Sequence, residues 1–305
     1  MVFPPRLAPL LLPYTRRELF EWQRLLQHLG IGWQAGHLEA WNTPALAVVR
    51  GKEHGFLMEL DRRDWAQRLT YFIGRYYEFG VLRTLDVLLR PGDHFVDVGA
   101  NIGMTSLHAR ARVGATGRID CFEPNPSTAD LLDRHVALNN LKNVHVHRAA
   151  LSDKREELQL RISDQHSGTA TLAETEASDR SVTVPVLRGD DVIDGAPDVV
   201  KIDVEGFELR ALRGMEGLLL RHRPALITEM IDQHLGRAGS SVLEVARWLS
   251  DRGYRASCIT SYRPRRYLSE RLKLVEVESP SDIGSHTDVL WTHSSKPMSR
   301  AGLIG

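Results

Sequence analysis

From residue 93 onward, segments with the hydrophobic pattern of strands alternate along the chain with segments that have the pattern of helices. Short apolar runs, typical of buried strands, are separated by stretches with the spacing of amphipathic helices. The predicted strands cover residues 93–98, 118–122, 143–148, 198–202, 225–230, 254–259 and 287–292, and the predicted helices cover residues 103–113, 127–139, 207–220 and 241–252. This alternation predicts an α/β fold with a mostly parallel, seven-stranded sheet and helices on both faces.

The residues before this region follow another pattern, which predicts an extension of helices and short strands. Residues 44–60 alternate as two short strands, and residues 64–90 have helical spacing with breaks near Gly74 and Gly80. A Pro-Gly turn then marks a boundary. The expected parts are an N-terminal extension over 1–90, an α/β domain over 91–295 and a flexible tail over 296–305.

Three further features complete the pattern. Residues 7–12 are apolar but short and flanked by prolines, so we interpret them as an arm on the domain rather than a signal peptide or membrane span. A helix is expected over residues 16–30. Residues 156–162 and 182–187 predict a hairpin across a polar loop.

Composition narrows the class of protein. The chain has 305 residues, and 39 basic residues balance 39 acidic ones, which disfavours a nucleic-acid partner. The two cysteines, Cys121 and Cys258, form neither a disulfide framework nor a zinc motif. A reducing, cytoplasmic setting is expected.

The turn after the first strand of the α/β region is the first candidate site, because ligands of parallel sheets bind beyond the carboxyl ends of the strands. It reads Asp97-Val98-Gly99-Ala100-Asn101-Ile102-Gly103. A dinucleotide site favours G-x-G-x-x-G, whereas this loop is one residue shorter and carries Asn101 in its middle. Asp97 can pair with an ammonium group and Asn101 can bond a carboxylate or amine, while a purely structural glycine turn is the alternative.

The turns after the second and third strands are expected at the same carboxyl edge of the sheet. Glu123, followed by Pro124 and Asn125, stands where a carboxylate can accept both hydroxyls of a ribose, although it can also simply complement a helix dipole. The turn Ala150-Leu151-Ser152-Asp153 offers small and polar groups to an adenine, with an ordinary turn equally favoured.

The fourth turn carries the candidate reaction chemistry. Asp203 and Glu205 follow an apolar strand, and either can accept a proton from a hydroxyl or hold it. Helix capping and pairing with Lys201 are the alternative roles. Glu229 ends the next strand as a third acid, and His166 in the polar loop is a candidate base or a solvated histidine.

Together these segments resemble the FkbM-like methyltransferase family over roughly residues 70–292. The similar motifs are DVGANIG (Asp97–Gly103), FEPNP (Phe122–Pro126), ALSD (Ala150–Asp153) and KIDVEGFE (Lys201–Glu208), with Gly74–Glu78, Ser167-Gly168, Asp190-Asp191, Glu229 and Asp288–Leu290. The combination is far more specific than any single motif.

The resemblance implies a class I methyltransferase (Rossmann-like) fold over 91–295, S-adenosylmethionine as cofactor, and O-methylation of a small molecule, natural product or sugar. The implied cofactor-binding residues are Glu78, Asp97, Gly99, Ala100, Asn101, Gly103, Glu123, Pro124, Asn125, Ala150, Leu151, Ser152, Asp153 and Asp203. The implied catalytic residues are Asp203, Glu205, Glu229 and His166.

Some alternatives stay open at this point. Asp203, Glu205 and Glu229 can hold Mg²⁺, although no dedicated metal motif is present. A nicotinamide oxidoreductase and a non-catalytic nucleotide-binding module compete with the methyltransferase. The expected partner is a hydroxylated small molecule or glycan, with no nucleic acid and with a homo-oligomer left open. The basic stretch 263–273 and the N-terminal extension match no motif, and such variable parts usually select the acceptor.

Overall fold

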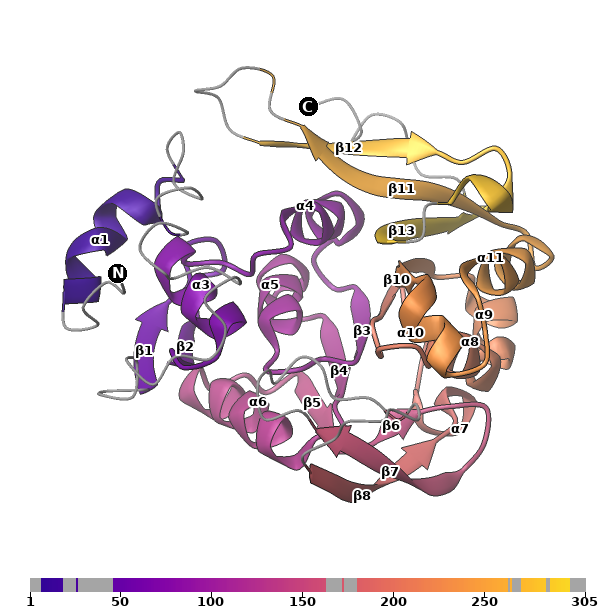
Figure 1. Cartoon of the computed structure of the whole chain (residues 1–305), viewed down its shortest axis with the longest axis horizontal. Helices are drawn as coiled ribbons and strands as arrows, with labels where there is room; N and C mark the ends of the chain where they lie inside the picture. The colour runs from indigo at the N-terminus through magenta and orange to yellow at the C-terminus, as the bar shows by residue number, and fades with distance from the viewer. Residues whose placement is uncertain are drawn as a thin grey trace.

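A sheet of eight strands lies at the centre of the computed structural model, which describes residues 7–18, 26, 46–162, 172, 180–262, 264, 270–283 and 286–296 (Figure 1). In their order across the sheet, the strands are β12 (Arg271–Glu276), β11 (Tyr254–Tyr262), β13 (His286–His293), β10 (Ala225–Ile231), β9 (Val199–Ile202), β3 (His94–Val98), β4 (Arg118–Phe122) and β5 (Val144–His147).

Strand directions confirm the predicted class I arrangement. Strands β5, β4, β3, β9 and β10 pair in parallel, β13 runs antiparallel beside β10, and β11 pairs antiparallel with β13. The predicted number of seven strands is one too few within the described residues. Part of the basic stretch forms β12 and pairs with β11 as an eighth strand, because an antiparallel edge strand needs only one buried side.

Helices cover both faces of this sheet, since neighbouring residues of a strand point to opposite sides. Phe95 and Ile227 belong to one core, and their neighbours Val96 and Leu226 belong to the other. The first core includes α3 (Trp65–Ile73), α4 (Phe79–Leu88), α5 (Met104–Val113) and α6 (Pro126–Leu138). The second includes α8 (Glu208–Gly214), α9 (Glu216–His222), α10 (Asp232–Arg237) and α11 (Val242–Ser250).

A small sheet stands beside the main one, with the order β6 (Ala150–Leu151), β8 (Arg180–Leu187) and β7 (Glu156–Ile162). It confirms the predicted hairpin, while most of the predicted polar loop, with His166, lies outside the described residues. The short helices α7 (Gly189–Val192) and η5 (Pro280–Asp282) are additions that the sequence pattern did not predict.

The N-terminal extension docks through a hairpin of β1 (Leu46–Arg50) and β2 (Leu57–Asp61), which confirms the two predicted strands. The Asn139 side chain accepts a hydrogen bond from the Leu57 backbone at 2.7 Å and donates one back at 2.8 Å. One hydrophobic core contains side chains from both sides of residue 90. The division into parts at that residue therefore stays a prediction.

Two helical predictions differ from the structure, and a third lies mostly outside the described residues. The helix expected over residues 64–90 breaks after α3 at Gly74, which has φ of 76°, whereas Gly80 lies inside α4. The helix expected over residues 207–220 divides at Met215. The apolar N-terminal segment forms helix α1 (Ala8–Thr15), and most of the helix expected over residues 16–30 lies outside the described residues. No helix among the described residues is long and apolar enough to cross a membrane.

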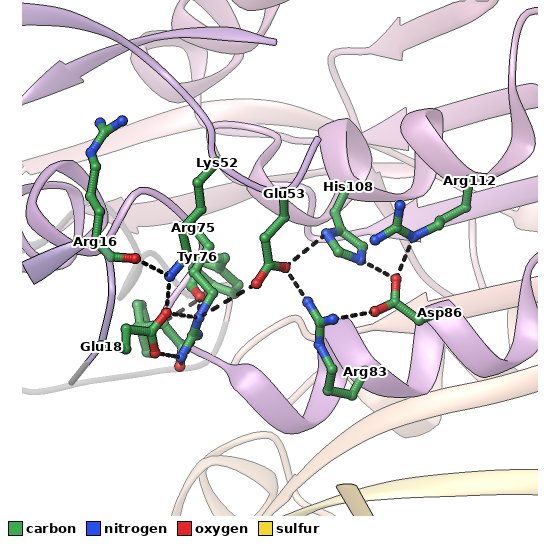
Figure 2. A network of polar contacts seen from close by, with 11 residues as sticks. Arg16, Glu18, Lys52, Glu53, Arg75, Tyr76, Arg83, Asp86, His108 and Arg112 are labelled. Atoms are coloured by element: carbon green, nitrogen blue, oxygen red, sulfur yellow. Dashed lines mark hydrogen bonds and ion pairs between the residues drawn. The ribbon is translucent and has the colours of Figure 1, made fainter. Parts of the chain in front are cut away.

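A chain of charged side chains links the end of α1 to α5 (Figure 2). Arg75, which is 2% exposed, makes a bidentate ion pair with Glu18 at 2.9 and 2.6 Å. The same guanidinium donates to the Tyr76 carbonyl at 2.6 Å. The chain of contacts continues through Glu53, Arg83 and Asp86 to His108 and Arg112. Arg75 thus holds the N-terminal segment and the peptide after α3 at once.

We predict that Arg75→Met lowers the free energy of unfolding by about 1.5–3 kcal/mol, because it removes the charged hydrogen bonds of Arg75 and leaves the partly buried Glu18 with only Lys52 as a partner. Urea denaturation followed by circular dichroism measures this change. The control is Arg63→Met, which breaks a more exposed pair with Asp61 and should cost no more than about 1 kcal/mol. Equal effects of the two variants would contradict the assigned role of Arg75.

Candidate functional site

A cavity opens at the carboxyl ends of β3, β4, β9 and β10, where parallel sheets bind their ligands. Its walls also include the start of α3 and the segment between α3 and α4. The predicted site residues that line it are Glu78, Gly99, Ala100, Asn101, Glu123, Pro124, Ala150, Leu151, Asp203, Glu205 and Glu229. The structure therefore brings together most of the residues that the motifs single out.

The first turn fixes the floor of the cavity. Gly99 has φ of 81°, and a Cβ atom there would lie 1.8 Å from the Asp203 carbonyl oxygen, so only glycine fits. Asn101 also has a positive φ, 49°, and its side-chain oxygen accepts from the Ile102 backbone. Asp97 lies fully buried beneath the turn, where one carboxylate oxygen accepts a 2.6 Å bond from Ser106.

Glu123 is held in place by the backbone on both sides. One carboxylate oxygen accepts from the Asn101 N–H and the other from the Asn125 N–H, both at 2.8 Å. Burial raises the pKa of Glu123 to about 7. Each oxygen keeps a further lone pair, so the side chain can accept two more hydrogen bonds from a ligand in the cavity.

The third turn contributes apolar surface. Ala150 and Leu151 line the cavity together with Phe122 and Leu160. Ser152 is fully buried beside α8, where a Cβ atom on Gly214 would lie 1.9 Å from the Ser152 carbonyl oxygen, and its hydroxyl donates to Asp153 at 3.0 Å. Five residues expected at the cofactor are therefore not among the cavity-lining residues of the described chain, namely Asp97, Gly103, Asn125, Ser152 and Asp153.

Lys201 places a positive charge beneath the fourth turn. Its buried ammonium group donates to an oxygen of Asp203 at 2.8 Å. Burial alone would lower the pKa of Lys201, but the carboxylates of Asp203, Asp97 and Glu78 raise it above its usual value. Lys201 therefore stays charged and holds the Asp203 carboxylate at the cavity edge.

The turn after Asp203 is sharply folded. Glu205 has φ of 52°, and a Cβ atom on Gly206 would lie 2.3 Å from the His234 carbonyl oxygen. The carboxylate of Glu208 accepts from the Val204 and Gly206 N–H groups at 3.1 and 3.2 Å. This folding presses the turn against α10 and presents Glu205 to the cavity.

Carboxylates crowd the remaining edge. Glu229 in β10 stands directly opposite Asp288 in β13, an arrangement of like charges that destabilises a sheet. Burial, followed by the neighbouring charges of Asp203 and Glu205, raises the pKa of Glu229 to about 10. Burial, followed by Asp288, raises the pKa of Glu78 to about 8. Glu229 and Glu78 therefore keep their protons near pH 7, and a positive charge bound at this edge would favour their ionised forms.

An aromatic wall closes the cavity on the side of the N-terminal extension. Trp65 and Tyr77 lie with ring centroids 5.3 Å apart, and Tyr76 lies 4.5 Å from Tyr77. All three line the cavity, and the Tyr76 hydroxyl donates to Glu78 at 3.0 Å. Sequence reasoning missed Trp65, because a single tryptophan at a helix start carries no spacing signal.

Fold and site together define a methyltransferase of class I. The matching family model is the methyltransferase FkbM domain, over residues 97–256, which is more than half of the chain. The chain therefore belongs to the FkbM methyltransferase family, and this confirms the methyltransferase prediction at the level of the family. Membership implies S-adenosylmethionine as the methyl donor.

Three curated relatives are methyltransferases. The chain is 29% identical over 163 residues to Methyltransferase 1 of Beauveria bassiana, covering 46% of this chain and 65% of that protein. It is 31% identical to methyltransferase sdnD of Sordaria araneosa, covering 50% and 74% of the two chains. It is 29% identical to the hexuronic acid methyltransferase AglP of Haloferax volcanii, covering 61% and 74%. The chain thus spans less than two thirds of the first of these relatives.

Solved structures resemble the chain more loosely. The methyltransferase FkbM of Methylobacillus flagellatus has 19% identity and a TM-score of 0.42, with 74% of this chain and 53% of that one covered. An S-adenosylmethionine-dependent O-methyltransferase of Thermotoga maritima has 14% identity and a TM-score of 0.41, with 73% and 68% covered.

The raised pKa of Glu78 predicts a pH-dependent loss of stability. The folded protein keeps this carboxyl protonated up to about pH 8, whereas the unfolded chain releases the proton near its ordinary pKa of about 4.5. The stabilising contribution is therefore complete below that value and is lost as the pH rises through 8. Between pH 5 and pH 8, the parent should lose at least about 1 kcal/mol more than Glu78→Gln.

Urea denaturation at the two pH values measures this difference. The control is Glu157→Gln, which alters an exposed carboxyl of β7 and should follow the parent. Parallel pH profiles of the parent and Glu78→Gln would contradict the assigned protonation of Glu78.

Proposed function

We propose that the chain is an S-adenosylmethionine-dependent O-methyltransferase acting on a hydroxyl of a small molecule or sugar. The observation that carries the proposal is the carboxylate of Glu123, fixed by two backbone N–H groups at the edge of the cavity. A carboxylate held in this way suits the two hydroxyls of a ribose.

The cavity offers matching groups on both sides of Glu123. Ala150, Leu151 and Phe122 provide an apolar surface for an adenine ring. The turn Gly99–Asn101 exposes backbone and amide groups to the methionine end. Asp97 and Asn125 support these groups from behind, through Ser106 and Glu123. The residues present therefore fit the donor.

The acidic edge is suited to the transfer step. Bound S-adenosylmethionine supplies an electrophilic methyl group on a positively charged sulfur, which the surrounding carboxylates favour. We assign Asp203 as the group that receives the proton of the acceptor hydroxyl, because it lies on the cavity wall and Lys201 fixes its other side. Glu205 and Glu229 hold the acceptor from the same edge.

A sugar acceptor agrees with two observations. Trp65 and Tyr77 offer flat aromatic faces at the cavity wall, and such faces pack against the apolar side of a ring. The relative AglP is a hexuronic acid methyltransferase by name. We therefore extend the proposal to glycosides as the first acceptors to screen.

Glu123→Gln should weaken the binding of S-adenosylhomocysteine by about 10- to 100-fold, which corresponds to losing a hydrogen bond to a charged group. A glutamine side chain offers one acceptor oxygen, so it cannot satisfy both backbone N–H groups and a ribose. Isothermal calorimetry measures the change, with exposed Glu157→Gln as the control. Unchanged affinity would refute the assignment of Glu123.

Asp203→Asn should leave S-adenosylhomocysteine affinity within a few-fold of the parent and lower kcat by roughly 10²- to 10⁴-fold, because an amide cannot accept the proton. Asparagine keeps an oxygen for the Lys201 ammonium group, so the fold should persist. Turnover of a hydroxylated acceptor under saturating donor is the readout. The control is exposed Asp191→Asn, and a kcat of Asp203→Asn equal to that of the control would rule out this role.

A further inference from the structure

Three potential ligands for a metal ion converge at the acidic edge, from three different elements. Glu205 lies in the turn after β9, Glu229 lies in β10 and His234 lies in α10. One ligand atom from each side chain falls within 4.8 Å of the others. This group of three ligands does not depend on the proposed methyl transfer, because it is present in the protein whichever donor or acceptor binds.

The backbone keeps these side chains together. The Gly206 Cα packs on the His234 carbonyl so closely that a side chain at position 206 would collide with it. Strands β9 and β10 pair in parallel, which places the end of each strand at the same edge. The turn that carries Glu205 and the helix that carries His234 are therefore fixed against each other.

The imidazole supplies a second observation, besides the two carboxylates. The Nδ1 atom of His234 lies 2.7 Å from an oxygen of Glu205 and 4.0 Å from an oxygen of Glu229. The His234 side chain is 23% exposed, so an ion can reach it from the cavity side, which Glu205 and Glu229 line. The imidazole and the two carboxylates thus face one another closely enough for one ion to replace the direct contact between His234 and Glu205.

We propose that Glu205, Glu229 and His234 form a binding site for a divalent first-row transition-metal ion such as Zn²⁺ or Mn²⁺. Ligand atoms about 2.1 Å from a shared ion lie at most about 4.2 Å apart. The two nitrogen–oxygen separations satisfy this limit, and all three ligand atoms lie within 4.8 Å of one another, so a small side-chain shift would bring the set around one ion. An imidazole beside two carboxylates suits these ions better than Mg²⁺, which takes oxygen ligands.

The ligand set differs from the one that the sequence suggests. Mg²⁺ held by Asp203, Glu205 and Glu229 finds no support among the described residues, since the converging ligand atoms do not include one from Asp203. His234 takes that place instead. Three protein ligands leave coordination positions open toward water or an acceptor oxygen, and Asp203 stays available for the proton.

The test uses the full chain after treatment with a chelator and its removal. Calorimetric titration with Zn²⁺ at pH 7 should show one ion per chain. His234→Ala should weaken this binding by more than about 100-fold, because the loss of outer-shell partners alone costs about 10- to 100-fold. Glu229→Gln provides a second variant with the same expected direction. The control is His145→Ala, a change on exposed surface, which should bind Zn²⁺ like the parent.

Titration of the same samples with S-adenosylhomocysteine separates this inference from the proposed function. Lost Zn²⁺ binding with retained S-adenosylhomocysteine binding in His234→Ala supports the metal site and shows that the variant is folded. A parent that binds no Zn²⁺, or Zn²⁺ binding that persists in both His234→Ala and Glu229→Gln, overturns it. A parent that binds Zn²⁺ but no S-adenosylhomocysteine supports the metal site and counts against the proposed function alone.

Discussion

The site depends on one close backbone contact, between the turn after β3 and the turn after β9. No side chain fits at Gly99, because its Cβ would lie 1.8 Å from the Asp203 carbonyl. The Asp203 N–H in turn donates to the Val98 carbonyl at 3.0 Å. These contacts fix the spacing between the cofactor side, with Glu123, and the acidic edge, with Glu229. Donor and acceptor can meet only if that spacing is kept.

The charges at the acidic edge follow from this backbone contact. Packing the turns together buries several carboxylates around Lys201, and the pKa values of Glu78 and Glu229 rise as a result. A positive charge bound at this edge would favour the ionised forms of these carboxyls. The positively charged sulfur of the proposed donor and the proposed divalent ion beside His234 would each supply such a charge.

The sequence predicts what is local and periodic. The seven strands, the glycine turn and Glu123 follow from hydrophobic periods and motif spacing, and the structure places them as expected. Ser152 was expected at the adenine but does not line the cavity, because a motif gives the position of a turn and not the surroundings of each side chain. Strand β12 and His234 were missed for another reason. Leu272 and Leu274 do alternate with Arg271 and Lys273, but this alternation is short and lies in a basic stretch, and a single histidine acquires its neighbours only through folding.

The central claim is that the cavity at the carboxyl ends of the strands binds S-adenosylmethionine rather than a dinucleotide. Calorimetric titration of the purified chain with S-adenosylhomocysteine, and in parallel with NAD⁺, tests it most directly. We expect one S-adenosylhomocysteine per chain and no binding of NAD⁺. Binding of NAD⁺, or no binding of either compound, would contradict it.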